Sequence, residues 1–165
     1  MESDREGCIY QINISRGGVP KAPIAVARVT IDGIEGDPHD DKQEHGGPMR
    51  ALCLYTLDEI ERLAGEGHPI YPGATGENVT LTGMPLDALT PGTRLALGDE
   101  ALVEVTTYTT PCKTIRGAFN DGIFTRISQK LHPGESRVYA RVVREGEIHA
   151  GDSVCIVDQA DSDAR

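Results

Sequence analysis

The chain has 165 residues, a formal net charge of −10 and no Trp. At this length one domain is the default, and the acidic balance argues against a nucleic-acid-binding protein, which needs a basic face. The apolar runs reach only four or five residues, as in 23–27, which predicts no membrane span. Residues 1–6 are polar and acidic, without the features of a secretory signal, so we expect a cytoplasmic protein.

The four cysteines are far apart and form no CxxC pair, so we expect four free thiols and no disulfide framework. With 19 Gly and 10 Pro, the chain carries turn residues throughout. Helical periodicity nowhere extends much beyond ten residues. This composition favours a β-rich fold.

The first segments of the chain read as strands. Residues 7–14 have the period-two pattern of a half-buried strand, with one face made of Cys8, Tyr10, Ile12 and Ile14. Residues 24–31 are rich in β-branched side chains and end at an Asp-Gly turn signal, so they predict a second strand. The polar segment 36–48 has no periodicity, and we expect a loop there.

A strand followed by a helix is predicted next. Residues 50–55 read as a strand, and Thr56 with Glu59 three positions later forms a capping-box pattern. We therefore expect a short helix over residues 57–65, closed by glycines.

The remainder of the chain predicts short strands and one helical region. The expected strands are 77–81, 93–97, 101–107, 137–144 and 153–157, with spacing typical of a β-meander or barrel. Residues 113–131 have helical spacing that Gly117 and Gly122 weaken or split. We take residues 1–157 as a single domain and residues 158–165 as a disordered acidic tail.

Charge is distributed unevenly along the chain. Residues 113–144 hold seven Lys or Arg and only two acidic residues, whereas the rest of the chain is strongly acidic. These cations suit a pocket for a small anion, because Arg and Lys bind phosphate by charge-assisted hydrogen bonds. The alternative is that they pair with acidic side chains on the surface.

Cys112 has the most distinctive local sequence among the cysteines. It follows a β-run and a proline and precedes the helical region, close to Lys113 and Arg116. A helix N-terminus and neighbouring cations favour the thiolate, which is a nucleophile and a soft-metal ligand. The alternative is a buried structural cysteine, which is what we expect for the other three, Cys8, Cys53 and Cys155, in apolar strand patterns.

Two polar segments are further candidates. In the loop 37–47, His39 and His45 flank several carboxylates, which suits a metal cluster, an acid/base pair or simply a solvated loop. The loop has no zinc-binding signature. The glycine-rich segment 72–79 resembles a ligand-contact turn, but turns of this kind are frequent.

Taken in order, these segments resemble the MOSC family, named for the C-terminal domain of molybdenum cofactor sulfurase. The resemblance covers about residues 8–157. It rests on Gly36-Asp37 through His45-Gly46-Gly47, Gly76-Glu77-Asn78, residues 95–98 followed by 103–106, Pro111-Cys112, and residues 136–142 with Gly146 and Gly151-Asp152. It implies a mainly β fold with short helices, a mostly antiparallel β-barrel of MOSC type.

The resemblance also implies a site centred on Cys112. That cysteine is either a thiolate ligand to molybdenum in the molybdenum cofactor (molybdopterin) or a sulfur carrier through a persulfide. Asp41 and His45 are expected near this thiol, with His39 as a neighbour. The cofactor is an anionic phosphorylated pterin, so the residues expected to bind it are Lys113, Arg116, Arg137 and Arg141 at the phosphate and Glu77 and Asn78 at the pterin edge.

The activity implied is reduction of N-hydroxylated small molecules such as hydroxylamino-purines, with Asp41 and His45 assisting proton transfer. The chain resembles a stand-alone member without an appended reductase, so electrons are expected from a separate flavin- or ferredoxin-type protein. One alternative is a sulfur carrier or cofactor-escort protein that uses a Cys112 persulfide without turnover of its own. A second is a ligand-binding barrel that has lost the metal.

Overall fold

The computed structural model of the chain describes residues 5–15, 19–37 and 47–158. Its strands are β1 (Glu6–Ile14), β2 (Ala22–Ile24), β3 (Val26–Thr30), β4 (Gly33–Ile34), β5 (Leu52–Thr56), β6 (Val79–Thr82), β7 (Arg94–Leu97), β8 (Ala101–Tyr108), β9 (Val138–Arg144), β10 (Gly146–His149) and β11 (Ser153–Val157). Its helices are α1 (Leu57–Gly65) and the short 3-10 helices η2 (Pro48–Arg50), η3 (Leu86–Ala88), η4 (Lys113–Ala118), η5 (Asn120–Gly122) and η6 (Phe124–Ile127).

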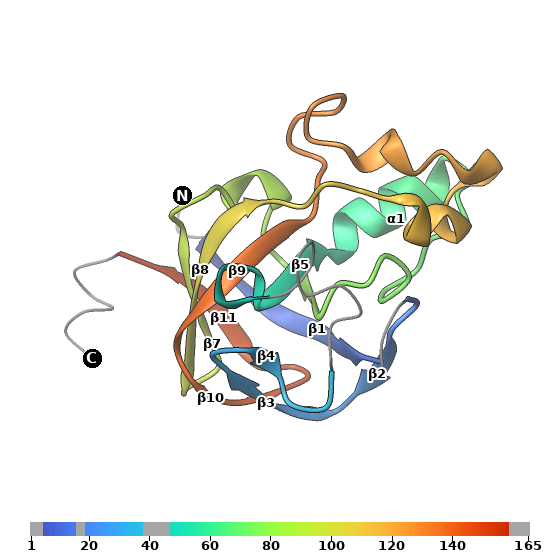
Figure 1. Cartoon of the computed structure of the whole chain (residues 1–165). Helices are drawn as coiled ribbons and strands as arrows, with labels where there is room; N and C mark the ends of the chain where they lie inside the picture. Colours follow the sequence, from blue (N-terminus) through green and yellow to red (C-terminus); the bar gives the residue numbers. More distant parts are fainter. Residues whose placement is uncertain (1–4, 16–18, 38–46, 159–165) are drawn as a thin grey trace.

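Seven strands form a closed barrel. The larger sheet has the order β11-β7-β8-β9-β5-β6-β1-β2, and an additional pairing of β11 with β1 closes it. All its pairs are antiparallel except the parallel pair of β5 with β6. The predicted, mostly antiparallel β-barrel is therefore confirmed. Strands β10, β3 and β4 form a separate small sheet (Figure 1).

The parallel pair follows from the helix between its two strands, because parallel neighbours need a long crossover connection. The Thr56 side chain caps α1 by accepting a hydrogen bond from the Glu59 backbone N–H at 3.4 Å. The helix buries Ile60 and Leu63. The predicted helix over residues 57–65 is confirmed.

Alternate residues of each barrel strand fill the core. Leu52 and Leu54 of β5 belong to the core cluster, as do Val138 and Ala140 of β9. Because successive side chains of a strand point to opposite faces, Cys53 and the residues level with it on β9 lie on the outer face of the barrel. The candidate site is built on this outer face.

The structure corrects the predicted face of β1. Ile9 and Ile12 are buried, whereas Cys8 and Tyr10 are exposed. The register with β6 shifts between Ile9 and Gln11, and such a bulge exchanges the two faces of a strand. The prediction that Cys8 is a buried structural cysteine is therefore wrong.

Two further differences concern the small sheet. The strand predicted over residues 24–31 is divided into β2 and β3, which pair with different partners. Strand β10 was missed, because residues 145–147 read as a connection. It pairs with β3 and buries Ile148.

The helical region after Cys112 consists of three separate 3-10 turns, η4, η5 and η6. Phe119 is extended between the first two, and Asp121 lies in the left-handed region with φ 57°. Gly122 also has a positive φ, which explains the division of the predicted helix. Figure 1 shows this segment beside α1. No helix in the described part of the chain is long and apolar enough to cross a membrane.

Candidate functional site

Cys112 lies at the junction between β8 and η4. It is half-buried, has an extended backbone and is the N-cap residue of η4. Its Sγ atom lies 2.9 Å from the Thr114 hydroxyl oxygen. Because η4 is a six-residue 3-10 turn, the predicted support from an α-helix N-terminus is absent at this junction. The residue nevertheless remains partly exposed to solvent.

Tyr139 marks the centre of a cluster on the outer face of the barrel. It pairs in register with Cys53 of β5, and the Arg50 guanidinium lies 5.5 Å from the centre of its ring. Burial raises the pKa of the Tyr139 hydroxyl; the thiols of Cys53 and Cys112 act in the same sense, and the cations Arg137 and Arg50 oppose them. The cluster therefore brings together residues from η2, β5, β9 and the start of η4.

Cys53 is the buried thiol of this cluster. Its Sγ lies 3.8 Å from the Thr109 hydroxyl oxygen. Burial raises the pKa of Cys53, and the nearby Arg137 opposes this effect. A buried thiol with a raised pKa remains protonated at neutral pH and is inert, as we expect for a structural cysteine.

Arg137 is a buried cation beside the Cys112 segment. Only 6% of the residue is exposed, and its backbone carbonyl accepts a hydrogen bond from the Thr109 N–H at 2.9 Å. Its Nη1 donates to the Thr75 carbonyl at 2.6 Å, while its buried Nε has no hydrogen-bond partner among the described residues. Buried N–H groups are rarely left without an acceptor, and a guanidinium binds anions by charge-assisted hydrogen bonds.

A buried hydrogen-bond network approaches Cys53 from the other side. Asp37 Oδ2 accepts hydrogen bonds from Lys21 Nζ at 2.5 Å and from Asn78 Nδ2 at 2.6 Å. Asp37 Oδ1 accepts one from the Ser15 N–H at 2.7 Å. Asn78 Oδ1 in turn accepts the Cys53 N–H at 2.9 Å. The network links the turn before β2 to the outer face of β5.

Glu77 anchors the glycine-rich turn before β6. It is fully buried, and its carboxylate accepts hydrogen bonds from the Gly73 N–H and the Thr75 and Thr80 hydroxyls, at 2.9 to 3.0 Å. Gly73 has φ +92°, and a Cβ there would collide with the Lys21 carbonyl oxygen. The polar atoms of Glu77, like those of Asn78, are thus engaged within the protein, where they shape the walls of the site.

The remaining predicted anion-binding residues differ in their environments. Lys113 and Arg116 are exposed and form no ion pair with another described residue. Arg141 instead directs Nε and Nη2 to Glu104, at 3.3 Å each. Arg126 likewise pairs with acidic side chains, Glu66 and Glu135. The alternative of surface ion pairing therefore holds for Arg126 and Arg141.

His39, Asp41 and His45 lie outside the described residues. Two described residues close to this segment in the chain, Asp37 and Arg50, belong to the surroundings of the site. Asp37 is part of the network that reaches Cys53, and Arg50 packs on Tyr139. Among the described residues, no three His, Cys, Asp or Glu side chains form a group able to hold a metal ion.

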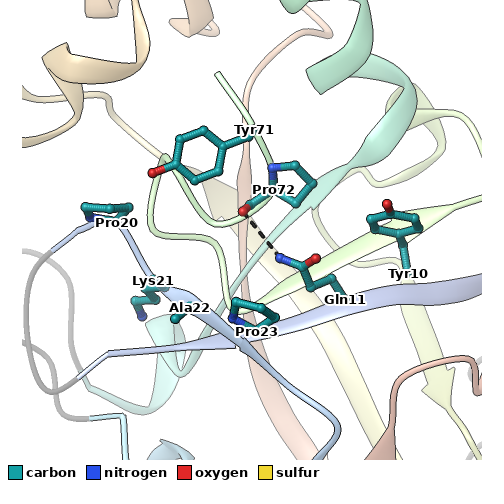
Figure 2. A pocket seen from close by; sticks show the side chains of 8 residues that line it. All are labelled: Tyr10, Gln11, Pro20, Lys21, Ala22, Pro23, Tyr71 and Pro72. Atoms are coloured by element: carbon teal, nitrogen blue, oxygen red, sulfur yellow. Dashed lines mark hydrogen bonds between the residues drawn. The ribbon is translucent and has the colours of Figure 1, made fainter. Parts of the chain in front are cut away.

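A surface pocket of about 410 Å³ lies near Lys21 (Figure 2). Its lining consists of Tyr10, Gln11, Pro20, Lys21, Ala22, Pro23, Tyr71 and Pro72. Neither this pocket nor Lys21 was predicted from the sequence, and Asp37 was named only within the loop 37–47 and the Gly36-Asp37 motif. The available signals were a lysine between two prolines, at 20–23, and an Asp between Gly36 and Pro38.

Comparisons with known proteins give concordant results. A family model for the MOSC domain matches residues 41–155. The uncharacterized protein YflK of Bacillus subtilis is 30% identical over 139 residues, which cover 81% of this chain and 60% of YflK. A Gibberella moniliformis protein named reductase is 30% identical over 132 residues, covering 77% of this chain and 23% of that protein. The chain thus spans 60% or less of the length of these relatives.

The structural comparison includes YiiM from Geobacillus stearothermophilus. Its crystal structure superimposes with a TM-score of 0.71 and 26% sequence identity, covering 93% of this chain and 76% of that one. The overall fold of the chain is thus also found in a solved structure.

Proposed function

The chain belongs to the MOSC domain family, and from this premise we propose that it is an oxidoreductase that binds the molybdenum cofactor and reduces N-hydroxylated compounds. The family is associated with binding of this cofactor, and one relative carries the name reductase. When bound, the cofactor supplies the metal centre for two-electron reduction of an N–O bond. In this proposal Cys112 is the thiolate ligand to molybdenum.

The observation that carries the proposal is the unpaired Nε of Arg137. This N–H is buried and lacks an acceptor within the described residues. It belongs to a side chain that donates to the Thr75 carbonyl and whose backbone pairs with Thr109, three residues before Cys112. The phosphate of an anionic cofactor would provide that acceptor. A half-buried thiol and a buried guanidinium together suit a group that is both thiolate-liganded and anionic, so the residues fit the cofactor.

Other residues have supporting roles in this proposal. Lys113 and Arg116 add positive charge at the rim of the site, next to Cys112 in the chain. Glu77 and Asn78 hold the wall against which the cofactor edge would lie. Arg141 is a weaker candidate, because Glu104 already occupies its guanidinium.

Reduction of an N–O bond consumes protons and electrons. We assign proton delivery to Asp41 and His45, with His39 as their neighbour, since an imidazole titrates near neutral pH. The electrons would come from a separate protein of flavin or ferredoxin type. These assignments are part of the same proposal and depend on the loaded cofactor.

The test is the molybdenum content of purified protein from cells that make the cofactor. We expect metal in the wild type and in the control Cys155→Ser, which removes a half-buried thiol on β11 outside the site. We expect metal to be lost in Cys112→Ser and reduced in Arg137→Met. Equal metal in Cys112→Ser and the control would contradict ligation by Cys112.

Sulfur transfer is the second candidate, and the partial exposure of Cys112 favours it, because a persulfide must be accessible to an acceptor. In that case intact-mass spectrometry of the wild type would show one extra sulfur atom on Cys112 and no stoichiometric molybdenum. Metal together with reduction of N-hydroxylated substrates by a flavin-type donor would support the enzyme instead.

A further inference from the structure

We propose that the pocket between β2 and the Tyr71-Pro72 segment binds an uncharged, planar heteroaromatic ring that carries an N–H donor. Figure 2 shows Pro20, Ala22 and Pro23 on one side of this pocket and Tyr71 with Pro72 on the other. Gln11 lies between them, and Tyr10 lies beyond Gln11. The volume of about 410 Å³ is in the range of small-molecule sites.

The walls favour a flat aromatic ligand. Tyr10 is 48% exposed and Tyr71 is 51% exposed, whereas Tyr55 and Tyr139 are buried. Two exposed aromatic rings that line one pocket provide stacking surfaces, and the neighbouring prolines add rigid apolar surface. A ring that stacks on such side chains binds with only a small loss of conformational entropy in the protein, because the walls are already in place.

The charge of the pocket favours a neutral ligand. Among the described residues of its lining Lys21 is the only charged one, and its ammonium is paired with the buried Asp37 carboxylate at 2.5 Å. An anion would therefore meet a cation that is already neutralised. A cation would meet no carboxylate among the described lining residues.

Besides the two tyrosine hydroxyls, the lining offers a fixed hydrogen-bond acceptor, the side-chain oxygen of Gln11. Gln11 Nε2 donates to Asn13 Oδ1 at 2.7 Å and to the Pro72 carbonyl at 3.3 Å. Both partners are acceptors, because Asn13 uses its own Nδ2 to donate to the Glu77 carbonyl and to Thr80. This orientation fixes the amide, and no described residue donates to Gln11 Oε1. A single N–H group of a heterocycle would donate to Gln11 Oε1. A sugar has several hydroxyls and would require several hydrogen-bonding groups in the lining.

The pocket is connected to Cys53 by a chain of hydrogen bonds. Lys21 lines the pocket and pairs with Asp37, which reaches Cys53 through Asn78. The ring-binding pocket thus lies at one end of the network whose other end reaches the Tyr139 cluster. The proposal goes beyond the function proposed above and does not require molybdenum.

The test is a fluorescence titration of the metal-free full chain with 2-aminopurine, an uncharged amino-substituted ring. The chain has no Trp, so the signal of the probe is free of indole emission. We expect saturable quenching and affinity about tenfold weaker in Tyr71→Leu and in Tyr10→Leu, the size typical of losing one stacked base. Val26→Ala, an exposed apolar residue outside the lining, is the matched control.

Three further measurements separate the possible outcomes. Cys112→Ser should bind the probe as the wild type does, even where it abolishes molybdenum retention, so the two proposals can fail independently. Non-saturable quenching, or wild-type affinity in both tyrosine variants, would overturn the pocket. Tighter binding of 2-aminopurine ribonucleoside monophosphate than of the base, or displacement of the base by choline, would overturn the assignment of a neutral ligand.

Discussion

Two thiols near Tyr139 lie in opposite environments. Cys53 lies on the outer face of β5 but is buried there, and burial raises its pKa. Cys112 is half-buried where β8 ends. Since the thiolate is the reactive form and access is also required, the two cysteines should differ in chemistry although both raise the pKa of one tyrosine.

We expect iodoacetamide at neutral pH to modify Cys112 in the folded protein and to leave Cys53 unmodified until the protein unfolds. Cys8, which is exposed, serves as the internal reference for an accessible thiol. Peptide mass spectrometry over time gives the order of modification. Modification of Cys53 at the rate of Cys112 would show that the cluster opens readily or that Cys53 has thiolate character.

Sequence reasoning identified Cys112 because its signals are local: a proline before it and cations after it. It missed the Lys21–Asp37–Asn78 network because its members are distant in the chain and only the folded barrel joins them. The burial of Arg137 was equally hidden, since composition counts a cation without showing whether water reaches it.

Arg94, Glu104 and Arg141 form a row across three neighbouring strands, β7, β8 and β9. The register places Glu104 opposite both arginines. Arg94 Nε donates to Glu104 Oε1 at 2.8 Å, and Arg141 approaches both carboxylate oxygens at 3.3 Å. The hydrogen bond from Arg94 lowers the pKa of Glu104, with Arg141 acting in the same sense and burial opposing it. This row ties the strands together only while the carboxylate is charged.

Glu104→Gln should therefore lower the free energy of unfolding by about 1 kcal/mol at neutral pH, the size of a partly exposed cross-strand ion pair. Because the pKa of Glu104 is lower in the folded than in the unfolded protein, its stabilisation is present above about pH 4.3 and is lost as the pH falls through the folded pKa. Urea unfolding from pH 7 to pH 3 measures this loss. The difference between wild type and variant should shrink towards zero at the acidic end.

The control is Glu61→Gln, which removes an exposed carboxylate of α1 and should leave stability unchanged across the range. A difference for Glu104→Gln that persists undiminished at pH 3 would mean that the row acts through packing and not through charge.

Elements with strong local signals were predicted well, and α1, with its Thr56 cap, is the clearest case. Strand β10 was missed because Ile148 is its one buried large apolar side chain, and its pairing with β3 joins residues more than a hundred positions apart. The 3-10 turns after Cys112 show the limit of periodicity. Of the apolar side chains at helical spacing, Ile115, Phe119 and Ile127 are buried, whereas Ile123 and Leu131 are exposed, because the backbone is not a continuous helix.

At the scale of the whole molecule, many short strands predicted a barrel, yet its closure is not a local property. Strand β1 closes the barrel, because it pairs with β11 at one end and with β6 and β2 along its length. We call β1 and its pairings with β11 and β6 the seam of the barrel. The bulge in β1 that exposes Cys8 and Tyr10 also lies in this seam. The two strands that pair with β1 to close the barrel come from distant parts of the chain, so sequence spacing could not identify them.

Gly7 lies in this seam and should tolerate no side chain. A Cβ at Gly7 would collide with the Thr82 carbonyl oxygen of β6 and lie 3.3 Å from the Met84 side chain. The backbone of β6 would have to move away, which weakens its pairing with β1 and disturbs closure. We expect Gly7→Ala to lower the free energy of unfolding by about 2–3 kcal/mol, a cost typical of overpacking.

Gly65→Ala is the matched control for the same chemical change. Gly65 ends α1, and a Cβ there would meet no atom within 4 Å. The substitution should raise stability by about 0.5–1 kcal/mol, because alanine favours the helix and restricts the unfolded chain. Urea unfolding of the two variants, with an unchanged dependence on urea concentration, measures both effects. Wild-type stability in Gly7→Ala would show that β6 can move at little cost and that closure of the barrel does not depend on close packing at this seam.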